Sequence, residues 1–153
     1  MEGSVTVSMA ASPEEIWDLI ADVRNTGKFS PETFEAEWLD GATGPALGAR
    51  FRGHVRRNEI GPVYWTTCRV TACEPGREFG FEVMVGHRAV NNWHYRLAPA
   101  GAGTDVTESF RLNMNPLMAV YSIFGGQLRR RRNLRDMKKT LERIRAVVEG
   151  GNP

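Results

Sequence analysis

Glu108 is the residue of this sequence that packing alone explains least well. It lies in the run 104–112, where Val106, Phe110 and Leu112 alternate with polar residues as in a half-buried strand. Glu108 shares the parity of these apolar residues. A carboxylate on an apolar face is unfavourable unless it is paired, hydrated or protonated, and burial raises its pKa. The pattern therefore makes Glu108 a candidate general acid or base.

Three structural explanations of Glu108 stay open beside the catalytic one: a strand end in solvent, a buried structural hydrogen bond, or a parity slip. The preceding run 89–97 has its own apolar set, Trp93, Tyr95 and Leu97. Matching the two sets across the hairpin places Trp93 or Tyr95 opposite Glu108. A phenol beside a carboxylate is a second proton-transfer group, so Tyr95 is the other catalytic candidate.

Other reactive side chains are poorly placed for chemistry. Of the three histidines, His54 and His94 have outward parities and His87 falls in a turn. Cys68 and Cys73 are five residues apart in one expected strand, which predicts opposite faces and free thiols. The scattered histidines and the two cysteines give no metal-ligand cluster, and the sequence has neither a nucleophile-elbow motif nor a phosphate-loop motif, so we expect neither metal nor cofactor.

Aromatic residues gather on the inward parities of the expected elements. Such rings either fill a core or line a pocket of about 300–1,000 Å³ for an apolar ligand. The candidate ligand-binding residues are Trp38, Phe51, Phe81, Trp93, Tyr95, Phe110, Tyr121 and Phe124, and Phe34 and Phe79 share their parity. The polar side chains of Tyr121 and Cys68 are lesser candidates on the same side.

A long C-terminal helix organises these elements. Pro116 follows Asn115, a favoured helix cap, and apolar residues then recur at helical spacing to about Glu149. The apolar stripe before Gly125-Gly126 and the stripe after it lie on different faces, so we expect a bend at this pair. Since the rest of the chain resembles strands, the helix must lie across a sheet.

The remaining elements follow from alternation and turn signals. Residues 12–15 form a capping box with proline at the first helical position, which predicts a helix over 13–23 and one further short turn near 25–31. Glu74-Pro75-Gly76-Arg77 is a type II turn, and pairing Cys73 with Glu78 sets the register of its hairpin. The expected strands cover residues 4–9, 34–38, 51–56, 65–73, 78–85, 89–97 and 104–112.

Composition and charge limit the function classes. The chain has 153 residues, which suits one domain over 1–149, with a disordered tail at 150–153. The start lacks the features of a signal peptide, and no run is apolar enough to span a membrane, so we expect a cytoplasmic protein. The net charge of +2 hides a basic C-terminal helix with the run 129–132. This run predicts a solvated face or peripheral contact with an anionic surface, whereas nucleic acid is disfavoured because no aromatic stacking platform accompanies it.

Three runs and their order resemble the START-related (SRPBCC) superfamily: the helix start 12–17, Trp65 to Gly76, and Trp93 to Thr107. This superfamily groups birch-pollen-allergen-like proteins, polyketide cyclases/dehydratases and lipid-transfer domains. The resemblance implies an α+β helix-grip fold, in which a curved seven-stranded antiparallel sheet wraps a long C-terminal helix, with two short N-terminal helices and an apolar cavity. No established catalytic set of the superfamily maps onto this chain.

Three hypotheses about function follow. The first is a binder or carrier of a hydrophobic small molecule, lipid or polyketide-like, in the cavity between sheet and helix. The second is a polyketide aromatase/cyclase or dehydratase that uses Glu108 or Tyr95 in the same cavity. The third is a regulatory module that contacts a partner through the basic helix. The ligand, the occurrence of catalysis and the formation of a homodimer are left open by the sequence.

Overall fold

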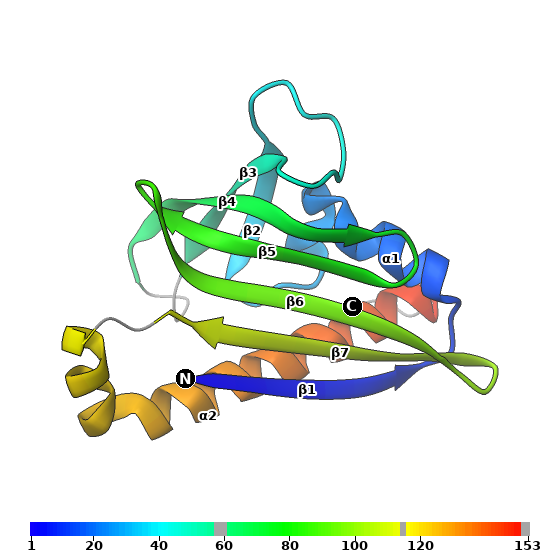
Figure 1. Cartoon of the computed structure of the whole chain (residues 1–153). Helices are drawn as coiled ribbons and strands as arrows, with labels where there is room; N and C mark the ends of the chain where they lie inside the picture. Colours follow the sequence, from blue (N-terminus) through cyan, green and yellow to red (C-terminus); the bar gives the residue numbers. More distant parts are fainter. Residues whose placement is uncertain (57–60, 114–115, 151–153) are drawn as a thin grey trace.

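The computed structural model describes residues 1–56, 61–113 and 116–150, with side chains in the last range from residue 126 onward. Seven strands form one open antiparallel sheet in the order β1-β7-β6-β5-β4-β3-β2, and the helices lie against one of its faces (Figure 1). The elements in chain order are β1 (Glu2–Met9), α1 (Pro13–Ala21), η1 (Val23–Lys28, a 3-10 helix), β2 (Thr33–Trp38), β3 (Arg50–Arg56), β4 (Val63–Glu74), β5 (Glu78–Val85), β6 (Arg88–Ala100), β7 (Gly103–Leu112) and α2 (Pro116–Val148). The α+β helix-grip prediction is confirmed.

Helix α1 begins where the capping box predicts. The hydroxyl of Ser12 accepts a hydrogen bond from the Glu15 backbone N–H at 3.2 Å, and Pro13 occupies the first turn. Ile16 and Ile20 are buried under the sheet. The helix ends at residue 21, earlier than expected, because Asp22 leaves the helical conformation and caps η1 instead.

Helix α2 crosses the sheet beside β1 and β7, and its C-terminal end reaches α1 (Figure 1). Its second apolar stripe does the packing, since Met137, Leu141 and Ile144 are all buried. From the first stripe, Leu128 is exposed. The axis changes direction in the yellow-to-orange part of Figure 1, the region of the glycine pair. The expected Asn115 cap and the tail from residue 151 lie outside the described residues.

The hydrophobic core fills one end of the space between sheet and helices. Buried side chains from α1, η1 and the C-terminal half of α2 meet those of the central strands there. The indole N–H of Trp17 donates to the Glu78 carbonyl at 2.8 Å and fixes α1 to the start of β5.

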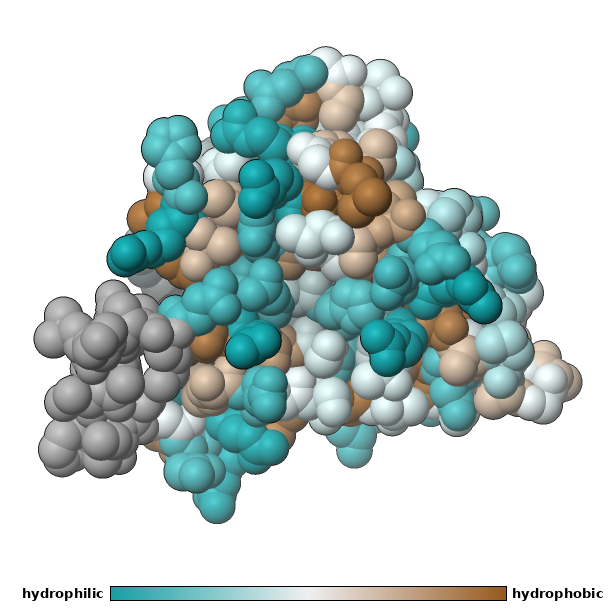
Figure 2. Space-filling model, in the orientation of Figure 1, coloured by the Kyte–Doolittle hydropathy of each residue, from teal (hydrophilic) through white to brown (hydrophobic). Residues whose placement is uncertain are grey.

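Seen from the side of Figure 1, hydrophilic side chains cover much of the surface and divide its apolar areas into small patches (Figure 2).

A β-bulge in β4 corrects the register predicted near the turn. Val70 pairs with Phe81 as expected, but Cys73 pairs with Phe79 rather than with Glu78, because Thr71 is an extra, unpaired residue. The bulge shifts parity, so Cys73 lies on the same face as Cys68, and the prediction of opposite faces is wrong. Both thiols are free, as predicted.

The position of Phe34 is a second correction. Its ring was expected to point inward, yet it is 44% exposed and lies 4.4 Å from the His54 ring, on the outer face. A register shift between Thr33 and Glu35 changes the parity at this strand end. Alternation therefore holds for Ala36 and fails two residues earlier.

Gly103 allows β1 and β7 to approach closely at the edge of the sheet. A Cβ atom added at Gly103 would lie 2.1 Å from the Met9 carbonyl oxygen. Next to it, the Thr104 hydroxyl donates to the Ala11 carbonyl at 2.8 Å, which fixes the chain between β1 and α1. Only glycine fits this contact without a backbone shift.

Gly103→Ala should therefore lower the free energy of unfolding by about 1–3 kcal/mol, the usual effect of forcing extra volume into a packed site. Denaturant unfolding followed by circular dichroism measures the change. Gly44→Ala is the matched control, because a Cβ atom at Gly44 meets nothing within 4 Å. Equal stability of the two variants would contradict this account of the β1–β7 contact.

Candidate functional site

A pocket of about 600 Å³ lies between the sheet and α2, beyond the end that the core fills. The sheet supplies an apolar wall from β3, β5 and β6, and α2 supplies the opposite wall. Its volume falls within the range of drug-sized ligand sites. Core residues of the central strands, such as Phe79, form the boundary between the packed end and the pocket.

Four of the predicted ligand-binding residues line this pocket: Phe51, Phe81, Trp93 and Tyr95. Phe51 and Phe81 pack edge to face, with ring centroids 5.2 Å apart. Trp93 lies opposite Phe81 on the neighbouring strand, so the rings form one continuous apolar surface.

The other predicted ligand-binding residues lie elsewhere. Trp38 packs behind Phe51 at 5.7 Å, and the buried Phe110 packs beside Trp93 at 5.7 Å; neither lines the pocket. Tyr121 and Phe124 lie in the part of α2 whose side chains are outside the described residues. A role in binding for these four residues stays a prediction.

The two predicted catalytic residues meet at the inner wall of the pocket. Tyr95 lies directly opposite Glu108 in the β6–β7 pairing, one of the two registers that the sequence left open. Its hydroxyl donates a hydrogen bond to Glu108 Oε1 at 3.1 Å. The side chains are only 6% and 4% exposed, so the bond is shielded from bulk water. Glu108 Oε2 is buried and has no hydrogen-bond partner among the described residues.

Burial controls the ionisation of this pair. It raises the pKa of Glu108 to about 8, and the hydrogen bond from Tyr95 lowers that pKa by a smaller amount. Burial also raises the pKa of Tyr95 well above its usual value, and the nearby Glu108 carboxyl adds to this effect. At neutral pH the side chain of Glu108 is therefore mostly protonated, and its unpartnered oxygen can donate or accept one further hydrogen bond.

Helix α2 contributes a polar wall that the sequence analysis missed. Its pocket-facing residues from 128 onward are Leu128, Arg129, Arg132, Asn133, Asp136, Met137 and Thr140. Most of them recur at spacings of three and four residues. Steps of four residues link Met137 to Asn133 and Arg129, and Asp136 to Arg132, so helical spacing places these side chains on the same side of α2.

Asn91 is a second polar residue that the analysis missed. It lies two residues before Trp93 on β6 and so shares its inward parity. Its Oδ1 atom is buried without a hydrogen-bond partner among the described residues, and the side chain lines the pocket. The alternation of Trp93, Tyr95 and Leu97 could have located it if extended by one step.

The remaining polar candidates have structural roles. Burial raises the pKa of the Cys68 thiol to about 12, so this pocket-lining thiol stays protonated and is a poor nucleophile. His54 and His94 lie on the outer face, where they contact Glu35 and Glu78 at 2.7 and 3.0 Å. Within the described parts of the chain, no group of His, Cys, Asp and Glu has the arrangement of a metal site.

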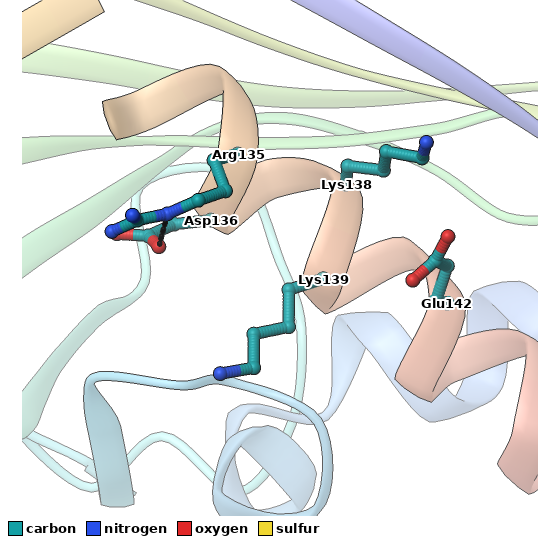
Figure 3. A pocket seen from close by; sticks show the side chains of 5 residues that line it. All are labelled: Arg135, Asp136, Lys138, Lys139 and Glu142. Atoms are coloured by element: carbon teal, nitrogen blue, oxygen red, sulfur yellow. Dashed lines mark ion pairs between the residues drawn. The ribbon is translucent and has the colours of Figure 1, made fainter. Parts of the chain in front are cut away.

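A second depression lies on α2 alone. Arg135, Asp136, Lys138, Lys139 and Glu142 line it, and Figure 3 shows their side chains leaving the helix in different directions. Arg135 and Asp136 form an ion pair at 3.6 Å. Because one helix face with charges of both signs provides no apolar wall, this depression is a poor small-molecule site. Contact of the basic run with a partner stays a prediction.

Comparison with known proteins identifies the family. The model of the family "Polyketide cyclase / dehydrase and lipid transport" matches residues 2–149. The chain belongs to this family. No curated protein sequence matches the chain. In the described residues, no helix combines the length and apolar character needed to cross a membrane.

Solved structures share the fold of this polyketide cyclase / dehydrase family member. A polyketide cyclase-like protein from Corynebacterium glutamicum is 27% identical, with a TM-score of 0.67 over 97% of this chain and 91% of that one. A protein from Deinococcus radiodurans is 17% identical, with a TM-score of 0.67 over 98% of both chains. The di-domain ARO/CYC of the steffimycin biosynthetic pathway is 13% identical, with a TM-score of 0.74 over 97% of this chain and 50% of that one.

The raised pKa of Glu108 predicts how the stability of the protein depends on pH. Between the ordinary value of 4.5 and about 8, the folded state holds a proton that the unfolded state releases. The free energy of unfolding should then fall as pH rises from 5 to 8, by up to about 1.4 kcal/mol per pH unit from this group. Urea unfolding at several pH values should show that Glu108→Gln removes this slope, whereas Glu142→Gln on the exposed face of α2 retains it.

Tyr95→Phe should raise the pKa of Glu108 above 8. The substitution removes the hydrogen bond that favours the ionised carboxylate and leaves Oε1 without its donor. A ¹³C NMR titration of the glutamate carboxyl carbons measures the midpoint. Tyr64→Phe is the matched control, because Tyr64 lines the pocket but makes no hydrogen bond to Glu108 in the described structure. A lower midpoint in Tyr95→Phe would contradict the assigned donor.

Proposed function

We propose that this chain binds an elongated apolar small molecule, of polyketide or lipid type, in the pocket between its sheet and α2. The observation that carries this proposal is the unpartnered, buried Oε2 of Glu108, a residue of a pocket wall that is largely apolar and contains several aromatic rings. A buried polar atom without a partner is unfavourable, so a ligand oxygen that bonds to it gains free energy. Membership of the polyketide cyclase / dehydrase and lipid transport family supports the same ligand class.

The pocket also matches such a ligand in its apolar contacts. Phe51, Phe81 and Trp93 form one surface on the sheet side, and at about 600 Å³ the pocket suits a molecule of several fused rings or a medium acyl chain. Burying an apolar body against these rings contributes about 25 cal/mol for each Å² of apolar area removed from water. The rings thus supply affinity, and Glu108 supplies orientation.

N-phenyl-1-naphthylamine, an uncharged fluorescent aromatic amine, is a suitable probe. It should bind saturably, with one site per chain, and Trp93→Ala should weaken its binding about tenfold, since losing some 60 Å² of ring contact corresponds to about 1.4 kcal/mol. Fluorescence titration measures the dissociation constants of the unmodified protein and of the Trp93→Ala variant. Trp65→Ala is the matched control, because Trp65 is 41% exposed on the outer face and does not line the pocket. Failure of the unmodified protein to bind any apolar probe would remove the proposal.

A second candidate function is acid–base catalysis on the same ligand, as in a polyketide cyclase or dehydratase. The observation that favours it is the pKa of about 8 at Glu108, which makes both its forms accessible near neutral pH. Ionised Glu108 would take a proton from a carbon between two carbonyls. The resulting enolate carbon attacks another carbonyl carbon of the ligand, and the new alkoxide recovers the proton from Glu108. Subsequent loss of that hydroxyl with a neighbouring proton releases water. Tyr95 would hold the carboxyl in place throughout.

Glu108→Gln distinguishes the two candidates, because glutamine keeps the size of the side chain but cannot transfer the proton. A synthetic poly-β-ketone thioester serves as substrate, with cyclised product measured by mass spectrometry. Catalysis predicts that the variant loses at least 100-fold in rate and still binds N-phenyl-1-naphthylamine. Equal product formation by both proteins would exclude Glu108 from the reaction, and no product from either would leave binding as the function.

A further inference from the structure

The polar groups of the pocket are distributed unevenly along its length. Glu108 and Tyr95 lie at the inner wall, next to the packed core. Asn91 is four residues from Tyr95 along β6, which corresponds to about 13 Å in a strand. Trp93 lies between them on the same face. The sheet wall is thus apolar in its middle and polar at both ends.

The outer end of the pocket carries positive charge from α2. Arg129 and Arg132 line the pocket, are exposed at its rim, and are three residues apart, so they lie on one face of the helix. Neither guanidinium makes an ion pair or hydrogen bond within the described part of the structure. By contrast, Arg130 on the adjacent face donates to the Glu2 carbonyl at 3.2 Å.

Among the described residues, no acidic side chain of the pocket forms an ion pair with these two arginines. Asp136 lies one turn beyond Arg132 on the same side of α2, but the ion pair that it forms is with Arg135, at 3.6 Å. Glu32 lines the pocket as well and has a partner of its own. Glu108 is at the opposite end. The two guanidinium groups at the rim are therefore available to an incoming anion.

We propose that the ligand of this pocket is an anionic amphipathic molecule, whose acidic group meets Arg129 and Arg132 at the rim while an uncharged oxygen reaches Glu108 at the inner wall. This inference rests on the proposed binding function and specifies its ligand class: an aromatic or acyl carboxylate with an elongated apolar body. Guanidinium groups bind carboxylates with charge-assisted hydrogen bonds, so they favour this orientation over the reverse one.

Two probes that differ in charge test the orientation and the ligand class. 1-Anilinonaphthalene-8-sulfonate has the ring system of N-phenyl-1-naphthylamine with one added sulfonate. Both probes should bind the same site, shown by mutual displacement at one site per chain. The double variant Arg129→Gln, Arg132→Gln should weaken sulfonate binding about tenfold, equivalent to about 1.4 kcal/mol, and change binding of the uncharged probe less than about twofold.

Two further variants make the result specific. Arg131→Gln with Arg145→Gln removes the same charge from α2 at positions that do not line the pocket, and both probes should then bind within about twofold of the unmodified protein. Arg129→Lys with Arg132→Lys keeps the charge and should restore most of the sulfonate affinity. Thermal unfolding checks that each variant is folded.

The outcomes separate the two proposals. If neither probe binds the unmodified protein, the binding function itself is wrong. If the uncharged probe binds and the sulfonate is unaffected by Arg129→Gln with Arg132→Gln, the anionic ligand is wrong and the binding function stands. Equal loss of sulfonate affinity in the Arg131 and Arg145 control would also overturn the inference, because it would assign the effect to the general charge of the helix.

A second experiment uses acyl ligands. Dodecanoate should displace N-phenyl-1-naphthylamine at a concentration at least about tenfold lower than methyl dodecanoate does. In the double variant Arg129→Gln, Arg132→Gln, the two ligands should displace the probe equally well. A carboxylate and its ester share the acyl chain, so their difference reports the charge alone. Equal displacement by acid and ester in the unmodified protein would overturn the inference for acyl ligands.

Discussion

One helix cannot cover a twisted seven-stranded sheet along its whole length, and this constraint underlies the structure. Where α1, η1 and the C-terminal half of α2 meet the sheet, Leu141 and Ile144 are fully buried and the interior is solid. Beyond that end, α2 presents Arg129 and Arg132 together with Leu128, and a pocket separates the helix from the sheet. The packed core and the pocket thus lie at opposite ends of one interface.

The boundary between these two ends holds the most unusual chemistry of the molecule. Glu108 is buried among apolar neighbours, which raises its pKa to about 8, and the Tyr95 hydroxyl supplies its hydrogen bond. A fully packed core would exclude such a group, while open solvent would return its pKa to the ordinary range. A carboxyl group in this position is compatible with both proposed functions: recognition of an uncharged ligand oxygen and transfer of a proton to or from the ligand.

Strand pairing was predictable wherever alternation was regular. The apolar sets of β6 and β7 place Tyr95 or Trp93 opposite Glu108, and the structure selects Tyr95. The prediction failed at irregularities of the sheet, where one extra residue reverses which face a side chain occupies. Thr71 is such a residue in β4, and a similar shift turns Phe34 outward. No turn signal or composition marks either place in the sequence.

The sequence by itself determined the order of the elements, the α+β class, the start of α1 at Ser12 and the presence of a carboxylate on an apolar strand face, because these depend on local periodicity and capping. Only the tertiary structure decided which end of the interior is filled, that Tyr95 rather than Trp93 lies opposite Glu108, and that Arg129 and Arg132 border the pocket rather than only solvent. Those facts depend on how far along the sheet α2 lies and how it is rotated, and both are set by contacts between residues distant in the chain.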